Sequence, residues 1–239
     1  MTFSQTYINT SNAPIYKNRS NVLYENRSNV PIYENTSFLS VLIRTHRRPK
    51  FLRRCLDSIN RQTKRNFIIV LISDYKEDRV ENLILEYPHL PFIIKHIEKP
   101  LPFPSCNTYF NMIKYIVNSD YVVFIDDDDL VTDENYFKKL ENIVLEKRHP
   151  AVIISRTEYG GLHFPTQEYW KKFPIACHIS TLNFCVRSDI YKKFDWPIIS
   201  GGDFHFISKI FKNIDWKKDV YWYDKMTTKI DHIGTGHPE

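Results

Sequence analysis

Four consecutive aspartates, Asp126 to Asp129, follow directly on the apolar run YVVFI at residues 121–125. A short run of β-branched and aromatic residues is typical of a buried parallel strand. Ligands bind at the carboxyl ends of such strands in open α/β sheets. Four adjacent carboxylates repel one another unless a cation holds them, and Mg²⁺ or Mn²⁺ often combines one or two carboxylates with substrate phosphates. The run therefore predicts a divalent-cation site at a strand end.

The same aspartates also have a purely structural interpretation. Acidic residues are favoured in the first turn of a helix because they face the positive end of its dipole. A helix is predicted at residues 134–147, so the acids are alternatively a solvated turn that begins it. We favour the cation site, because a plain turn does not require four acids behind a buried strand.

A further acid, Asp203, stands in the segment PIISGGDFHFISKIF at residues 197–211. It follows two glycines and precedes an amphipathic helical pattern formed by Phe206, Ile207, Ile210 and Phe211. Such an acid is either a helix N-cap or a carboxylate that removes a proton from a substrate as a general base. These residues leave both interpretations open.

The elements that position these acids alternate along the chain from residue 38. Apolar runs predict strands at residues 38–43, 67–72, 92–95, 121–125 and 151–154. Apolar residues at helical spacing predict helices at residues 49–59, 80–87, 109–117 and 134–147. This alternation predicts an α/β fold with βαβ units and a mostly parallel sheet. Right-handed crossovers then bring Arg44–Thr45, Ser73–Asp74 and Asp126–Asp129 to one crevice.

The placement of glycine excludes two classes of nucleotide site. All six glycines lie after residue 159. The dinucleotide-binding fingerprint and the P-loop both need glycines in an early turn between a strand and a helix. Neither motif is present in this chain.

The first 37 residues have a different character from the rest. They contain three near-copies of one unit, SNAPIYKNR (11–19), SNVLYENR (20–27) and SNVPIYENT (28–36). Asn, Ser and Pro dominate, and the apolar pairs are isolated, so we expect an extended or weakly ordered N-terminal extension over residues 1–37. A partner-binding role and a duplication without function are equally open.

Size and charge limit the possible partners. The chain has 239 residues, 42% of them hydrophobic, and a formal net charge of +5. This composition supports one large domain, predicted at residues 38–239, with a substantial core. The mild positive charge suits an anionic small-molecule substrate and is too weak to predict binding of nucleic acid.

The cysteines and the N-terminus predict a compartment. Cys55, Cys106, Cys177 and Cys185 are widely spaced and form no CxxC pair, so we expect reduced, buried thiols in an intracellular protein. The N-terminus lacks the apolar core of a signal peptide. The longest apolar runs are too short for a transmembrane segment. We expect a soluble, cytoplasmic protein.

Aromatic residues concentrate between residues 159 and 223, which contain all four tryptophans, Trp170, Trp196, Trp216 and Trp222. Aromatic rings beside a site can stack on sugar rings. They can equally pack the second half of the core. Both interpretations are kept.

Three stretches of the chain resemble family-2-type glycosyltransferases with the GT-A fold. They are SVLIRTHRRPKFLRRCLDSINRQT (40–63), FIDDDDL (124–130) and STLNFCVRSDIYKKFDWP (180–197), the last followed by GGDFHF (201–206). The resemblance extends from about residue 38 to about residue 211, and its motifs are specific through their order and spacing. It implies a GT-A-like sheet flanked by helices, with a nucleotide-sugar half at 38–133 and an acceptor half at 134–239.

The resemblance also assigns roles on the donor side. It implies that the donor is a nucleotide-sugar, with a UDP-sugar expected, and that a base contact comes from the end of the second strand. The family usually has an Asp-Asp-Gly-Ser-like run there, whereas this chain has SDYKED (73–78), which leaves the choice of base open. The implied nucleotide-sugar-binding residues are Arg44, Thr45, Asp74, Asp126 and Asp127.

For the chemistry, the resemblance implies a metal-dependent, inverting transfer to a glycan, protein or small-molecule acceptor. Asp128 is the implied ligand of Mn²⁺ or Mg²⁺, with Asp129 in support. A late histidine often reaches the metal in this family, and here His232 is the first choice and His237 the second. Asp203 is the implied general base.

Two alternatives compete with this interpretation. The run VFIDDDDLVT (123–132) resembles the opening of haloacid-dehalogenase-like phosphatases, but it follows three βα units, and Leu130 stands where a Thr or Val is usual. The other alternative is a non-catalytic sugar- or protein-binding relative. The presence of both Asp128 and Asp203 argues against it.

Overall fold

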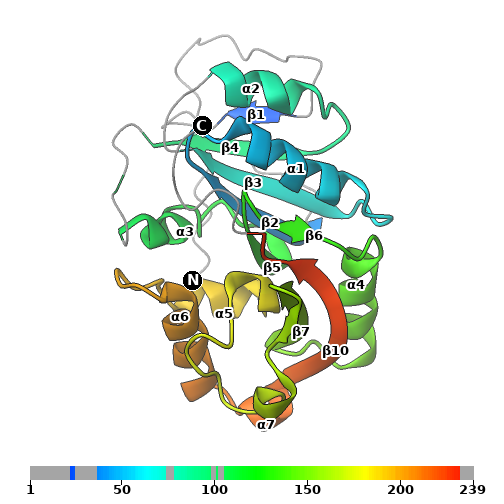
Figure 1. The fold of residues 1–239 in the computed structure, drawn as a ribbon, viewed down its shortest axis with the longest axis vertical. Coiled ribbons are helices and arrows are strands. Elements are labelled where there is room, and N and C mark those ends of the chain that lie inside the picture. Colours follow the sequence, from blue (N-terminus) through cyan, green and yellow to red (C-terminus); the bar gives the residue numbers. More distant parts are fainter. Residues whose placement is uncertain (1–21, 25–36, 74–77, 98–100, 102–104, 232–239) are drawn as a thin grey trace, which may run out of the picture.

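The computed structural model describes residues 22–24, 37–73, 78–97, 101 and 105–231. Within these ranges the chain forms a ten-stranded mixed sheet with the strand order β1–β4–β3–β2–β5–β9–β7–β10–β6, and β8 pairs with β7 (Figure 1). Helices cover both faces, so the structure confirms the predicted α/β class.

The half of the sheet that contains β2 to β5 is parallel, as its apolar runs predict. It consists of β2 (Ser37–Thr45), β3 (Phe67–Ser73), β4 (Phe92–His96) and β5 (Ser119–Asp126). The register places Thr45 opposite Ser73 and Arg44 opposite Asp126. The predicted meeting of strand ends is therefore confirmed for these residues, while Asp74 lies outside the described part of the chain.

The second half of the sheet contains antiparallel strands. Strand β9 (Phe184–Arg187) runs antiparallel between β5 and β7 (Val152–Tyr159). Strand β10 (Val220–Lys229) is parallel to β7. Two short antiparallel strands, β6 (Leu130–Val131) and β8 (Leu162–Phe164), pair with β10 and β7.

Two hydrophobic cores lie on opposite faces of the sheet. One face carries α1 (Pro49–Asn60), α2 (Asp78–Leu85) and α4 (Tyr136–Glu146), and the other carries α3 (Tyr109–Met112), α5 (Ser188–Lys193) and α6 (Gly202–Lys212). The short helix α7 (Trp216–Asp219) precedes β10. Helix α1 shows why these segments are helical: Pro49 stands in its first turn, and its buried apolar residues recur at helical spacing, at Leu52, Cys55, Leu56 and Ile59.

Helix α3 is shorter than predicted. The apolar spacing predicts a helix to residue 117, yet the α-helix ends at Met112 and a 3₁₀ turn, Ser105–Thr108, precedes it. The backbone N–H of Ile116 bonds to the carbonyl of Ile113, three residues back. Such tighter turns end an α-helix, although the apolar side chains of the segment remain buried.

The tryptophans pack the core on the face that carries α3, α5 and α6. Trp170 and Trp196 are buried, and Trp196 stacks on Phe206 with ring centroids 4.4 Å apart. Trp216 and Trp222 are partly buried against the same core. The packing interpretation is therefore confirmed for the four tryptophans, and the sugar-stacking interpretation is wrong for the buried pair.

A segment of the N-terminal repeats joins the sheet. Strand β1 (Val22–Tyr24) belongs to the middle repeat and pairs in parallel with β4 at the sheet edge. These three residues are extended, which is one of the two conformations expected for this segment. The first and third repeats lie outside the described residues.

Two further expectations concern the cysteines and membrane segments. Cys55 and Cys185 are buried as expected, but Cys177 is exposed, which corrects the prediction for that thiol. The side chain of Cys106 lies outside the described part. Over the described ranges, no helix combines the length and the apolar character needed to cross a bilayer.

Candidate active site

A tight turn holds the four aspartates at the end of β5. The backbone N–H of Asp129 donates to the carbonyl of Asp126 at 3.0 Å, and β6 follows at once. Helix α4 begins later, at Tyr136. The interpretation of these acids as the first turn of a helix is therefore wrong, and they form a strand-end cluster.

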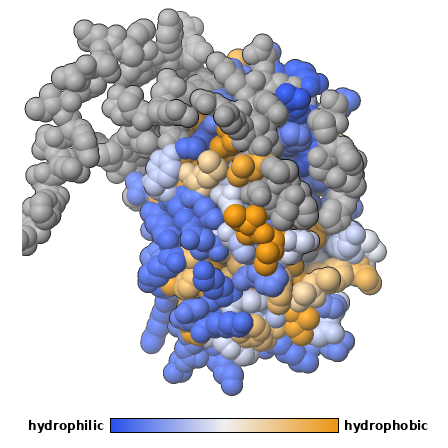
Figure 2. All heavy atoms as spheres, turned by 90° about the vertical axis from the view of Figure 1, so that its left-hand side faces the viewer, coloured by the Kyte–Doolittle hydropathy of each residue, from blue (hydrophilic) through white to orange (hydrophobic). Residues whose placement is uncertain are grey.

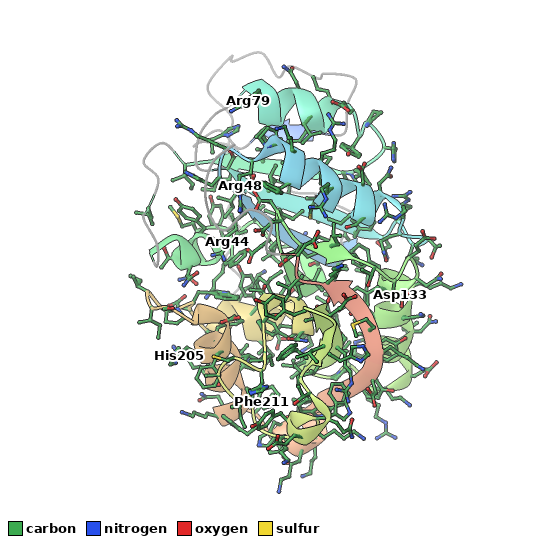
Figure 3. The ribbon with its side chains drawn as sticks, in the orientation of Figure 1. Arg44, Arg48, Arg79, Asp133, His205 and Phe211 are labelled. Carbon is green, nitrogen blue, oxygen red and sulfur yellow. The ribbon has the colours of Figure 1, made fainter. Side chains whose placement is uncertain are left out.

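Arg44 binds the first acid of the cluster at two points. Its Nε donates to Asp126 Oδ1 at 2.6 Å and its Nη2 to Asp126 Oδ2 at 3.2 Å. Its Nη1 donates to Asn107 Oδ1 at 2.9 Å. A planar guanidinium held on both edges has a fixed orientation. Figure 3 shows Arg44 and Arg48 close together, between α1 and the half of the molecule that carries α6.

Asp127 is fully buried and faces the protein interior. Thr45 Oγ1 donates to its Oδ2 at 2.6 Å, Arg48 Nε donates to the same oxygen at 3.2 Å, and Arg48 Nη2 donates to Oδ1. Burial raises the pKa of Asp127 to about 7, against the opposing effects of the Arg48 charge and the Thr45 hydroxyl. As placed, Thr45 and Asp127 bind each other, so their support of a donor would be indirect.

Of the remaining acids, Asp128 is partly exposed, and Asp129 is buried beside the last described residue of the chain. Asp128 Oδ2 is 3.2 Å from Arg48 Nη1. Asp129 Oδ1 accepts the backbone N–H of Asp231 at 3.3 Å, and Asp231 also pairs with Arg54 on α1. Burial raises the pKa of Asp129, and the neighbouring aspartates raise it further. The chain thus returns to the acid cluster at Asp231, one residue before His232; His232 and His237 lie outside the described residues.

The acid cluster suits a metal site in which the protein supplies few of the ligands. Within the described ranges, no group of three or more His, Cys, Asp or Glu side chains is placed to hold a metal ion. Both oxygens of Asp126 are bound by Arg44, whereas one oxygen of Asp128 carries the contact with Arg48. These residues fit a cation that takes one or two carboxylates and completes its shell with phosphate oxygens and water.

Asp203 lies in the first turn of α6, but it does not cap the helix. The N-cap is Gly201, whose φ of 68° is in the left-handed region that favours glycine. Asp203 Oδ1 accepts the backbone N–H of Phe204 at 2.8 Å. Burial raises the pKa of Asp203, the Asp126 charge adds to the rise, and the Arg44 charge opposes it. The N-cap interpretation is wrong, and Asp203 is within electrostatic reach of the acid cluster.

The segment before α6 exposes apolar side chains beside this acid. Ile198 is 61% exposed and Ile199 is 40% exposed. Figure 2 shows apolar groups in the middle of the face that includes α3 and α6, with hydrophilic groups to their left and below them.

Sequence reasoning missed two residues of the site, Arg48 and Asn107. Arg48 stands directly before Pro49, at the start of α1, and its charge is complementary to the aspartates, so charge matching was a usable signal. Asn107 lies in a short 3₁₀ turn without any pattern. Its contacts with Arg44 and with the carbonyl of Ile199 depend on the tertiary fold.

Comparisons with solved structures agree on the fold. TarS of S. aureus superposes with a TM-score of 0.67 at 17% identity, covering 80% of this chain and 36% of TarS. Residues 1–349 of TarS in complex with UDP give a TM-score of 0.66 at 19% identity, covering 80% of this chain and 60% of that one. The mannosyltransferase PcManGT of Pyrobaculum calidifontis, in complex with GDP-Man and Mn²⁺, gives 0.62 at 15% identity, covering 83% and 58%. The fold is therefore that of the GT-A glycosyltransferases.

Sequence comparison gives the family. The glycosyltransferase GlyA of Streptococcus pneumoniae serotype 4 is 29% identical over 110 residues, which are 45% of this chain and 15% of GlyA. The chain thus spans a small part of that relative. The model of glycosyl transferase family 2 matches residues 40–214, well over half of the 239 residues, and contains both the aspartate cluster and Asp203. On this match and the shared fold, the chain belongs to glycosyl transferase family 2.

Proposed function

We propose that this chain transfers a sugar from a nucleotide-sugar, a UDP-sugar, to an acceptor hydroxyl with inversion and with the help of a divalent cation. One observation carries the proposal. Asn107 accepts the Nη1 of Arg44, donates to the carbonyl of Ile199 and packs against Gly202, so the turn that carries Asp203 lies beside the Arg44–Asp126 pair although it belongs to a different half of the fold. One group of acids for the donor and one separate acid for the proton are the minimum set for such a transfer.

Several features support a nucleotide-sugar donor. The parallel strand ends are the usual ligand site of an open α/β sheet. Solved neighbours contain UDP, UDP-GlcNAc or GDP-Man. In this chain the Arg44–Asp126 pair would face the sugar-nucleotide, with Thr45 and Asp127 behind it. Asp74 remains the candidate for the base contact.

Asp128 is the proposed metal-binding carboxylate, since its side chain is partly exposed and the contact with Arg48 is made by one of its two oxygens. His232 is the proposed second ligand. The return of the chain to Asp129 through the Asp231 N–H supports this choice. A bound Mn²⁺ or Mg²⁺ would stabilise the negative charge of the leaving diphosphate as a Lewis acid.

Asp203 is the proposed general base. Its carboxylate takes the proton of the acceptor hydroxyl while the hydroxyl oxygen bonds to the anomeric carbon. The bond from that carbon to the diphosphate breaks, and the nucleoside diphosphate leaves with the electron pair. A single displacement inverts the anomeric centre. The raised pKa of Asp203 makes it a stronger base than an ordinary carboxylate.

The proposed transfer is tested by incubating the full chain with a panel of UDP-sugars and Mn²⁺ and measuring UDP release. We expect slow hydrolysis of one preferred donor, lost on addition of EDTA. When an acceptor is supplied, transfer should be strongly reduced in the Asp203→Asn variant. Complete silence with every donor would instead support the non-catalytic alternative. The phosphatase alternative is wrong, because the chain belongs to a glycosyltransferase family.

A further inference from the structure

Two asparagines, four residues apart, hold the segment that precedes α6. Asn111 Nδ2 donates to the carbonyl of Trp196 at 3.0 Å, and the N–H of Trp196 donates to Asn111 Oδ1 at 2.8 Å. Asn107 Nδ2 donates to the carbonyl of Ile199 at 2.8 Å. The two asparagines differ at the amide oxygen. Asn107 Oδ1 accepts the Nη1 of Arg44 at 2.9 Å, whereas Asn111 Oδ1 accepts the N–H of Trp196.

Asn107 also packs against the residue before Asp203. A Cβ built on Gly202 would lie 2.7 Å from Asn107 Nδ2 and 3.1 Å from its Cγ. A side chain at residue 202 would therefore displace the Asn107 amide. Asn107 is itself 6% exposed, so its amide is wedged between Arg44 and the start of α6.

We propose that Asn107 is a positioning residue that fixes Asp203 relative to the Arg44–Asp126 pair. The link runs through two hydrogen bonds and one close packing contact, from Arg44 to Asn107 and from Asn107 to Ile199 and Gly202. This inference rests on the proposed role of Asp203 as the base. A displacement of about 1 Å at a reacting group can reduce the rate of a reaction by about 100-fold.

Turnover separates this role from a merely structural one. Asn107→Ala is expected to lower kcat by about 10- to 100-fold, with the donor KM and the UDP affinity nearly unchanged. Asn111→Ala is the matched control, because it removes two hydrogen bonds to the same segment but does not reach Arg44. Its kcat should stay near that of the wild type, although its melting temperature falls.

Equal losses of kcat in the two variants would overturn the proposal. So would an Asn107→Ala variant whose UDP affinity falls together with its kcat, because the residue would then support the donor site as a whole.

A second test does not depend on turnover. Gly202→Ala should displace the Asn107 amide and so lower the free energy of unfolding. In the double variant Asn107→Ala/Gly202→Ala this amide is absent, so its free energy of unfolding should match that of Asn107→Ala alone. Hydrogen exchange at residues 199–204 should accelerate in Asn107→Ala, and exchange at 121–131 should not change. Additive losses, or exchange that does not change at 199–204, would refute the link. If the wild type transfers no sugar, the proposed function fails, while these two measurements still report on the link itself.

Discussion

The guanidinium of Arg48 and the carboxylate of Asp127 form a buried two-point ion pair that joins the start of α1 to the end of β5. The exposed fractions of the two side chains are 9% and 0%. Removal of one partner from a buried pair leaves an uncompensated charge or an unsatisfied polar group in the interior. The pair is therefore a structural support beneath the acid cluster.

Arg48→Ala is expected to lower the free energy of unfolding by about 3–5 kcal/mol, the usual effect of breaking a buried pair. Chemical denaturation measures it. Arg53→Ala is the control, since Arg53 is on the same helix and pairs with Glu86 at the surface; exposed pairs contribute little because water and salt screen them. Equal destabilisation by both substitutions would contradict the buried role.

Asp128→Ala is expected to weaken the binding of UDP in the presence of Mn²⁺ and to abolish transfer, because the carboxylate would hold the cation that bridges the diphosphate. Calorimetric titration with UDP, with and without Mn²⁺, measures the effect. Asp133→Ala is the control, since Asp133 lies beyond the acid run and pairs with Lys139. The prediction fails if Mn²⁺ makes no difference to UDP affinity in either the wild type or the Asp128 variant.

The pH dependence of transfer follows from the raised pKa of Asp203. A general base must be ionised, so kcat should fall as the pH drops through this pKa, at a higher pH than for an ordinary aspartate with a pKa of about 3.9. Arg44→Gln removes the charge that opposes the rise, so the acid limb should move to still higher pH. A limb at the ordinary carboxyl pKa in both proteins would argue against Asp203 as the base.

Asp203→Asn should decrease activity and increase stability. Transfer should fall by about 10²–10⁴, the usual contribution of a positioned base. A raised carboxyl pKa contributes stability that is fully present below the unfolded pKa and is lost as the pH rises through the folded pKa. At pH 7 the ionised Asp203 therefore opposes folding, and Asn removes that effect. Melting temperatures of the variant and the wild type at pH 7 and at pH 4 check the sign, and the gain should be much smaller at the lower pH.

Truncation tests the contribution of the repeats. Deletion of residues 1–36 should leave a folded domain that binds donor, because the sheet retains β2 to β10. It also removes β1 and bares the edge of β4, so self-association should increase. Deletion of residues 1–21 keeps β1 and serves as the control. Light scattering and thermal melting distinguish the two proteins, and loss of the melting transition in the longer deletion would show that β1 is essential for folding.

The sequence predicted those features whose signal is local. The strands β2 to β5 and β7 and the helices α1, α2, α4 and α6 follow from apolar runs and helical spacing within a few residues. The aspartate turn and the placement of Asp203 in the first turn of a helix also have local signals. These local signals were sufficient to predict the α/β class with a mostly parallel sheet.

The missed features depend on contacts across the fold. The pairing of Arg48 with Asp127 joins residues 79 positions apart, and that of Asn107 with Ile199 joins residues 92 positions apart. No periodicity records such a pair. Strand β1 has three residues, too few for an alternation to show, and the antiparallel course of β9 is set by its neighbours rather than by its own four residues.

Strand β1 also bears on how this chain can vary. The outer edge of β4 has room for one strand, and the middle of three near-identical units occupies it. Because the outer edge of a sheet pairs with one strand, a single copy of the unit is enough to cover β4, whatever the number of copies in the array.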